Sequence, residues 1–315
     1  VPTATAVPTP TPTAIPPTAT PVPTATTVPT PTPTVIPPTA TPMPTATAVP
    51  TPMPTPTPVP ALKRIAFYTN GNIYTVNIDG TGLRELTGGA SPSWSPNEDK
   101  IVYSFQGDIV VMDSDGSNSI TLTDATDYSN NTPSWSPNGT KIVFSSDRGP
   151  GNSEIYVMNS DGSNQTALTD TEGSNHYPTW SHDGSKIAFE SLRDNDEELY
   201  VMNADGSNET RITNNSPIND ESPTWSPTAD KIAFKSNRVA GAPWEIWVVN
   251  SDGSNPVRIT NSQFSNGSPS WSPDGTKIVF SAYRNGTNGI SIINSDGTNE
   301  TRLLDSSGTE PRWEP

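Results

Sequence analysis

One repeated motif constrains this chain more than any other feature of its sequence. Between Ile73 and Leu304, a β-rich run ends six times in Asx-x-Asp-Gly, and five of those copies follow a Ser/Thr-Trp-Ser-Pro/His motif. The tryptophans of this motif and one more recur at spacings of 41, 45, 45, 46 and 42 residues, at Trp94, Trp135, Trp180, Trp225, Trp271 and Trp313. Such a period is typical of a four-stranded propeller blade. The sequence therefore predicts an all-β fold, a β-propeller.

Each repeat divides into four short segments that read as strands. Around Trp180 these are residues 177–181, 186–191, 198–203 and 210–213, which are rich in β-branched and aromatic side chains. The third and fourth segments are joined through Asp-Gly. That dipeptide is preferred in type I′ turns, which need positive φ at both central residues, so we expect a type I′ hairpin in every repeat.

The turns and the tryptophans are offset along the chain. The first Asx-x-Asp-Gly turn, at Asp79, has no motif tryptophan before it, and Trp313 has no such turn after it. We therefore expect residues 64–87 to form three strands of a blade whose innermost strand is residues 310–313. Joining both ends of the domain in this way removes open sheet edges. The sequence predicts a six-bladed propeller of four-stranded blades over residues 61–315.

Residues 1–60 have a different composition, with 21 prolines, 20 threonines and no charged residue. Proline at this frequency prevents helix formation, and Pro, Thr and Ala alone form no packed core. A 21-residue unit repeats from Pro2, Pro23 and Pro44. Polyproline II has three residues per turn, so every unit presents the same faces, and the segment would extend about 190 Å. We expect an extended, polyproline-II-like stalk over residues 1–60.

The stalk is a substrate for O-glycosylation of the mucin-like type, because it is dense in threonine in Thr-Pro context. The alternative is an unmodified, flexible spacer. The candidate glycosylation sites are Thr3, Thr5, Thr9, Thr11, Thr13, Thr18, Thr20, Thr24, Thr26, Thr27, Thr30, Thr32, Thr34, Thr39, Thr41, Thr45, Thr47, Thr51, Thr55 and Thr57.

The charge of the chain restricts its partners. The net charge of −16 falls entirely on residues 61–315, and there is no cysteine. A strongly acidic domain is a poor ligand for nucleic acid and gains nothing from an anionic membrane surface. No run of about 18 apolar residues is present, so we expect no direct insertion into a membrane.

The repeat resembles that of the TolB-like (WD40-like, PD40) β-propellers over residues 64–313. The stretches from Trp271 (Trp-Ser-Pro-Asp-Gly-Thr-Lys-Ile-Val-Phe) and from Glu154 (Glu-Ile-Tyr-Val-Met-Asn-Ser-Asp-Gly-Ser-Asn) carry the resemblance. It implies a scaffold that binds proteins or other ligands, usually outside the bacterial cytoplasm and in most members without catalysis. TolB itself carries an α/β domain before its propeller, whereas this sequence has the Thr/Pro-rich segment there. A role in the Tol system therefore does not follow from the resemblance.

Loop lengths indicate which face of the propeller binds. The Asx-x-Asp-Gly and Ser-Pro-x-x-x-Lys turns hardly vary, whereas the loops of the opposite face all differ, and binding sites are carried by such variable loops. Aromatic side chains beside carboxylates suit a sugar or peptide ligand, although the same side chains also serve to pack loops. The candidate ligand residues are Asp127, Tyr128, His176, Tyr177, Asp220, Glu221, Trp244, Phe264, Tyr283 and Glu310.

Three further motifs favour structural roles. Asp-x-Asp-Gly at residues 113–116 is similar to the start of a calcium loop, but the glutamate that completes such a loop is out of register, which favours a hairpin. Arginines that end the second strand (Arg148, Arg193, Arg238, Arg284) are expected to pair with glutamates that open the third (Glu154, Glu198, Glu245). The eight Asn-x-Ser/Thr sequons, such as Asn138, Asn208 and Asn299, mostly coincide with repeat turns.

Catalysis is not expected. Polysaccharide lyases of similar fold use a histidine cluster and a metal, and His176 and His182 are the only histidines here. We assign no catalytic, cofactor-binding or metal-binding residue, although a bound cation and an acidic pair suited to glycoside hydrolysis stay open.

Two non-catalytic functions follow from the residues. One is a bacterial extracellular or cell-surface structural protein, in which a glycosylated stalk, capable of self-assembly into a fibre, carries a propeller head that contacts protein or polysaccharide. The other is a carbohydrate-binding adhesin on a flexible tether. The regular period of the stalk favours the first.

Overall fold

The computed structural model describes residues 62–149, 151–239, 241–305 and 308–315, so the predicted stalk and its threonines lie outside the described residues. None of the described elements is a helix able to span a bilayer. The strands are β1 (Arg64–Thr69), β2 (Asn72–Asn77), β3 (Arg84–Gly88), β4 (Ala90–Trp94), β5 (Lys100–Phe105), β6 (Asp108–Asp113), β7 (Ile120–Thr121), β8 (Asn130–Trp135), β9 (Lys141–Ser146), β10 (Glu154–Asn159), β11 (Thr166–Ala167), β12 (Asn175–Trp180), β13 (Lys186–Ser191), β14 (Glu198–Asn203), β15 (Thr210–Arg211), β16 (Asp220–Trp225), β17 (Lys231–Ser236), β18 (Glu245–Asn250), β19 (Val257–Arg258), β20 (Asn266–Trp271), β21 (Lys277–Arg284), β22 (Thr287–Asn294), β23 (Thr301–Leu304) and β24 (Thr309–Trp313).

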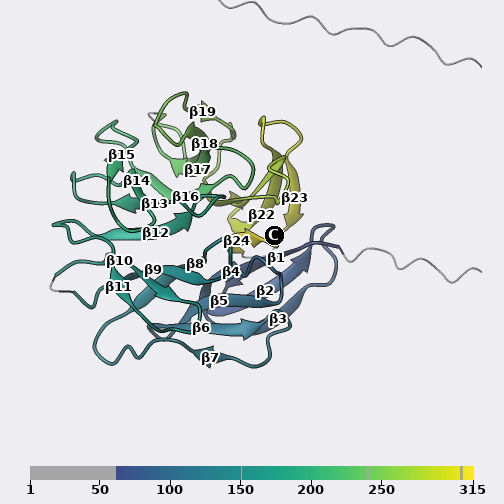
Figure 1. The fold of residues 1–315 in the computed structure, drawn as a ribbon. Helices are drawn as coiled ribbons and strands as arrows, with labels where there is room; N and C mark the ends of the chain where they lie inside the picture. The colour runs from purple at the N-terminus through teal and green to yellow at the C-terminus, as the bar shows by residue number, and fades with distance from the viewer. Residues whose placement is uncertain (1–61, 150, 240, 306–307) are drawn as a thin grey trace, which may run out of the picture. The chain divides into compact units, whose positions relative to one another are not determined.

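These strands form six antiparallel sheets of four, which confirms the predicted six-bladed propeller. We number the blades I (β24-β1-β2-β3), II (β4-β5-β6-β7), III (β8-β9-β10-β11), IV (β12-β13-β14-β15), V (β16-β17-β18-β19) and VI (β20-β21-β22-β23). The first strand of each blade contacts the first strands of both neighbouring blades, so β24, β4, β8, β12, β16 and β20 form the inner ring (Figure 1).

Blade I joins the two ends of the domain, as the offset of turns and tryptophans predicted. Strand β24 pairs with β1, with Ile65 opposite Trp313. Beyond the sheet, the backbone N–H of Glu314 donates to the carbonyl of Arg64 at 2.9 Å, and the Arg64 guanidinium contacts the Glu314 carboxylate at 2.5 Å. A chain segment from the far end of the sequence thus covers the inner edge of β1.

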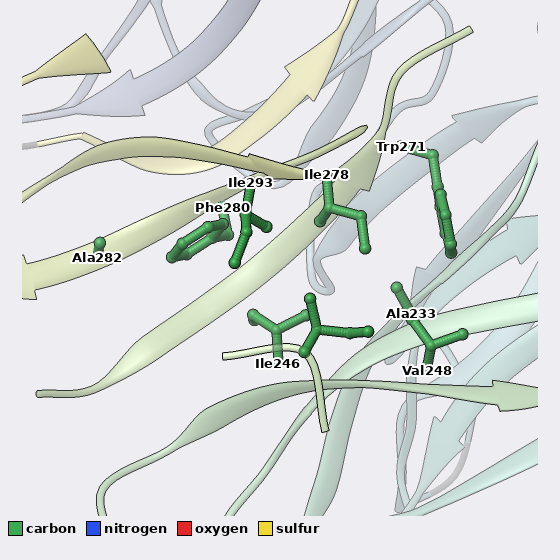
Figure 2. Packing of buried hydrophobic residues seen from close by; sticks show 9 residues of the cluster. Ala233, Ile246, Val248, Trp271, Ile278, Phe280, Ala282 and Ile293 are labelled. Atoms are coloured by element: carbon green, nitrogen blue, oxygen red, sulfur yellow. The ribbon is translucent and has the colours of Figure 1, made fainter. Parts of the chain in front are cut away.

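The hydrophobic core lies between neighbouring blades. Six clusters of buried side chains each combine residues of two consecutive blades. Between blades V and VI, Ala233, Ile246 and Val248 pack against Trp271 and Phe280 (Figure 2). The phenylalanine at the fourth position of the second strand is fully buried in five blades, at Phe67, Phe144, Phe189, Phe234 and Phe280. Each repeat is therefore stabilised by burying apolar area against its neighbours.

The predicted type I′ turn between third and fourth strands is wrong. In blade II, only Gly116 of the Asp-Gly pair has positive φ, at 88°, whereas Asp115 does not. The N–H of Asp113 donates to the carbonyl of Ser117, which closes a three-residue loop, and the Asp115 carboxylate accepts from the N–H and hydroxyl of Ser117. This is a type I turn followed by a glycine in the left-handed region. The Asp-Gly dipeptide is compatible with a two-residue type I′ turn and with this three-residue loop. The hydrogen bonds from Ser117 to the Asp115 carboxylate favour the three-residue loop.

The predicted pairing of second-strand arginines with third-strand glutamates is also wrong. Glu198 is fully buried and accepts from the Thr213 hydroxyl, from the Asn215 N–H and from Arg211 of the fourth strand at 2.7 Å. Arg193 instead contacts Glu209. The glutamate points toward the end of the fourth strand and the following loop, so the arginine does not reach it.

The same separation recurs in the other blades. Arg258 binds Glu245 at 2.8 Å, Thr169 and the N–H of Thr171 donate to Glu154, and Arg238 contacts Asp220 at 2.6 Å. In blade VI, the guanidinium of Arg284 lies 3.0 Å from Glu300.

Candidate functional site

The two faces of the propeller differ in the chemistry that they carry. The Trp-Ser-Pro and Asx-x-Asp-Gly turns lie at one face, which we call the constant face. The opposite face, where first strands begin and second strands end, carries the loops of unequal length and is called the variable face. All ten predicted ligand residues lie at the variable face, near the start of a first strand, near the end of a second strand or in the adjoining loops.

A channel runs along the axis of the ring, lined by the first strands. Every first strand contains a bulge three residues before its tryptophan, and the residue there has positive φ, between 46° and 54°. A bulge bends its strand and re-aims a side chain, and positive φ is uncommon for residues other than glycine. The bulge residues are Ser91, Thr132, Tyr177, Ser222, Ser268 and Glu310. Repetition of the same backbone in all six blades makes their side chains directly comparable.

Comparison of the six blades shows where the chain departs from its own pattern. The bulge residue is Ser or Thr in four blades, but Tyr177 in blade IV and Glu310 in blade I. The fifth residue of the second strand is serine in three blades and Tyr68 in blade I, but it is Glu190 in blade IV and Lys235 in blade V. Five blades have Ser or Thr before the tryptophan, and blade I has Arg312. Because these departures are not needed to build a blade, they mark the candidate site.

Three of the departing side chains, Tyr177, Glu190 and Glu310, lie close to Glu221 and Glu197 at the variable-face end of the channel. We call these five residues the mouth. The Glu190 carboxyl is 5% exposed and accepts the N–H of Ser222, at the bulge of the next blade, at 2.7 Å. Burial raises the pKa of Glu190 to about 8, against the lowering effect of that hydrogen bond. At neutral pH this group is therefore mostly protonated, and it can donate a hydrogen bond.

Lys235 lies near two further carboxyl groups of the mouth, Glu221 and Glu197. Lys235 contacts Glu221 at 2.5 Å, and its ammonium lies 4.8 Å from the centre of the Trp244 ring. Burial and the neighbouring Glu221 carboxylate raise the pKa of Glu197 to about 7. Near neutral pH, the Glu197 carboxyl is therefore protonated part of the time.

Tyr177 links the mouth to the channel. Burial, followed by the nearby Glu310 and Glu190, raises the pKa of the Tyr177 phenol, which is thus neutral. The Glu310 carboxylate accepts from the Ser91 hydroxyl at 2.9 Å. Arg312 lies deeper, and burial lowers the pKa of its guanidinium, against the effect of Glu310. The phenol, the carboxylate and the guanidinium can all bind polar groups of a ligand.

The structure therefore brings together three of the predicted ligand residues, Tyr177, Glu221 and Glu310. Asp220 is fully buried, and burial raises its pKa despite the contact with Arg238, so it belongs to the framework of blade V. His176 precedes Tyr177 on β12, and burial lowers its pKa.

The remaining predicted residues do not line the channel cavity. A basic side chain lies over one face of three of the aromatic rings: Arg148 lies 4.8 Å from the Tyr128 ring, Lys235 the same distance from the Trp244 ring, and Arg284 5.5 Å from the Phe264 ring. A sugar cannot stack on a ring face that is already covered. Asp127 and Tyr283 are exposed.

Sequence reasoning missed Glu190, Glu197, Lys235 and Arg312. Glu190, Lys235 and Arg312 sit inside regular strands, whereas a search for variable loops looks between the strands. Aligning the six repeats position by position would have found these three, since each replaces a serine or threonine of the other blades. Within the described ranges, no three His, Asp or Glu side chains are grouped so as to hold a metal ion.

Comparison with known proteins places the chain among propellers of one family. The sequence profile described as the TolB beta propeller domain matches residues 105–315. The solved structure of a putative TolB from Agrobacterium tumefaciens is 25% identical over 79% of this chain and 91% of its own, with a TM-score of 0.68. TolB from Acinetobacter baumannii is 22% identical over 80% of this chain and 67% of its own, with a TM-score of 0.70.

More distant structures share only the fold. An oligogalacturonate lyase in complex with manganese is 15% identical, covers 77% of this chain and 72% of its own, and has a TM-score of 0.53. No protein of curated function matches the chain significantly.

Proposed function

Because this chain belongs to the family of TolB β-propeller domains, we propose that it is a non-catalytic interaction protein whose propeller binds a partner protein at the mouth. One observation carries this proposal. Side chains that depart from the six-fold pattern gather in one channel, with a phenol and carboxyl groups at its mouth and the Arg312 guanidinium deeper inside. Complementary charged and polar groups fix the register of a protein interface.

The covered aromatic rings favour a protein over a sugar as the partner. A carbohydrate-binding adhesin needs open ring faces, and three of the predicted aromatic residues have basic side chains over their rings. The adhesin and a polysaccharide-degrading enzyme are therefore the less favoured alternatives.

Residues 1–60 suit the display of such a head at a bacterial surface or outside the cell. Their composition fits an extended, O-glycosylated stalk, and a regular stalk can also assemble laterally into a fibre. Mass mapping of peptides from residues 1–60 of native material, before and after chemical deglycosylation, tests this part. Sugar increments on the threonines are expected, and unmodified peptides would instead indicate a flexible tether.

Photocrosslinking from the mouth tests the interaction. A photoreactive phenylalanine analogue at position 177 should capture one protein, and the same analogue at position 74, on the third strand of blade I, should not. The captured protein, once purified, should bind the full chain saturably. Replacing Tyr177 by Ala together with Glu221 by Gln should weaken that binding at least tenfold. Equal binding by this double variant, or equal capture from both positions, would contradict the proposal.

A further inference from the structure

A ring of side chains inside the channel differs chemically from the mouth. The residue before each tryptophan faces the channel in all six blades, and together these residues form what we call the collar: Ser93, Ser134, Thr179, Thr224, Ser270 and Arg312. Five hydroxyl groups and a single guanidinium thus surround one cavity, of about 180 Å³.

The collar has hydrogen-bond donors that the protein itself does not use. Among the described residues, no side-chain hydrogen bond is formed by the hydroxyls of Ser93, Ser134, Thr179 or Thr224, which are half-buried. The Ser270 hydroxyl accepts from the Trp313 N–H at 3.1 Å, which leaves its own proton free. These hydroxyl groups face the cavity, where they can bond a ligand. A cavity with this many free donors is suited to an acceptor.

Arg312 indicates that the acceptor is negatively charged. In the described part of the chain, its guanidinium donates only to the carbonyl of the adjacent Pro311, at 3.1 Å, and it forms no ion pair. The nearest acidic side chain on the same strand, Glu310, is engaged by Ser91. A guanidinium has five N–H donors in a planar fork that matches a carboxylate, and removing it from bulk water is costly without a partner.

We propose that the collar binds a carboxylate group of the partner polypeptide, with Arg312 as its bidentate donor and the hydroxyl groups completing its coordination. This inference rests on the proposed function and names the chemistry of the same channel. The cavity is smaller than the roughly 300–1,000 Å³ of sites that enclose a whole ligand, so it admits a chain end or one acidic side chain.

The acidity of the mouth does not prevent a carboxylate from reaching the collar. Glu190 is mostly protonated at neutral pH, and Lys235 compensates Glu221. The remaining carboxylate close to Arg312 is Glu310, and Tyr177 is neutral. The guanidinium is thus the one cation in the collar, and it provides the attraction once the ligand has passed the mouth.

Titration calorimetry with the full chain tests the proposal. The probes are N-acetylglycine, its neutral amide N-acetylglycinamide, and glucuronate as an acidic sugar. N-acetylglycine should bind saturably and at least tenfold more tightly than the amide. Tighter binding of glucuronate than of N-acetylglycine would overturn the assignment to a polypeptide, and equal binding of N-acetylglycine and its amide would overturn the carboxylate site.

Variants locate the binding in the collar. Arg312→Gln should abolish N-acetylglycine binding, and Arg84→Gln, which removes an exposed arginine of β3, should leave it unchanged. Thr179→Val and Thr224→Val keep the side-chain volume and Arg312, and each should weaken binding several-fold. If Arg312→Gln fails to fold, the two threonine variants provide the test. Binding of N-acetylglycine at wild-type strength by both of them would overturn the assignment of the site to the collar. If the unmodified chain does not bind N-acetylglycine but the analogue at position 177 still captures its partner, the carboxylate site is refuted and the proposed function is not.

Discussion

Closure of the ring depends on Glu314, so replacing it by Gln should destabilise the propeller measurably. The side chain is 6% exposed. Its Oε1 accepts from Arg64 Nη2 at 2.5 Å and from Nε at 3.0 Å, and its Oε2 accepts from the Arg64 backbone N–H at 2.7 Å. Both carboxylate oxygens thus face donors. In whichever orientation the amide of Gln is placed, its NH₂ group meets another donor.

The size of the effect follows from burial. Removing one partner of a fully buried ion pair costs about 3–5 kcal/mol. The Arg64 side chain is 30% exposed, so water replaces part of the lost interaction, and we expect about 2 kcal/mol. For a domain of this size, that corresponds to a fall in unfolding temperature of about 4–8 °C.

Differential scanning calorimetry of the full chain measures this change. Asp305→Asn is the matched control, because it removes one negative charge from the Arg302–Asp305 contact of 3.2 Å, where Asp305 is 95% exposed. The control should change stability by less than about 0.5 kcal/mol. Equal shifts in the two variants, or no shift for Glu314→Gln, would refute the reasoning from burial.

Two further predictions concern the same ring. Deleting residues 309–315 removes β24 with its buried Trp313 and leaves the inner edge of β1 without a partner strand. The unfolding temperature should therefore fall by more than about 10 °C. An unchanged transition would contradict closure of the ring by β24. The pKa of Glu190 is about 8 in the fold against an ordinary 4.5, so the folded state keeps a proton that the unfolded state releases. The resulting stability is fully present below about pH 4.5 and is lost as the pH rises through 8. Glu190→Gln should therefore gain stability relative to wild type between pH 5 and 9, by about 2–4 kcal/mol in urea unfolding, and parallel pH profiles would contradict this.

The architecture was predictable because it depends on spacing. Tryptophan period and turn count are properties of the sequence alone, and the mismatch between Asp79 and Trp313 identified which segments share a blade. Each blade repeats the same apolar positions, so the inter-blade core follows from the pattern. Nothing in this reasoning required the direction of any side chain.

The errors arose where side-chain direction decides the contact. Arg193 and Glu198 are close along the chain, yet Glu198 turns toward Thr213, while Arg193 reaches Asn175 and Glu209. Likewise, Asp115 is compatible with two turn types, and its hydrogen bonds to Ser117 select one of them. Sequence proximity restricts the possible partners of a charged group, and local geometry chooses among them.

The strand that closes the ring also carries the two most unusual groups of the channel, Glu310 and Arg312. They alternate along β24 with the buried Pro311 and Trp313, which keep their repeat roles, so β24 satisfies the packing of blade I while Glu310 and Arg312 are free to differ. Any ligand bound by Arg312 therefore contacts β24, the strand that joins the two ends of the domain. Binding in the collar should consequently stabilise closure of blade I, because a ligand that binds only the folded ring adds its binding free energy to the stability of that ring.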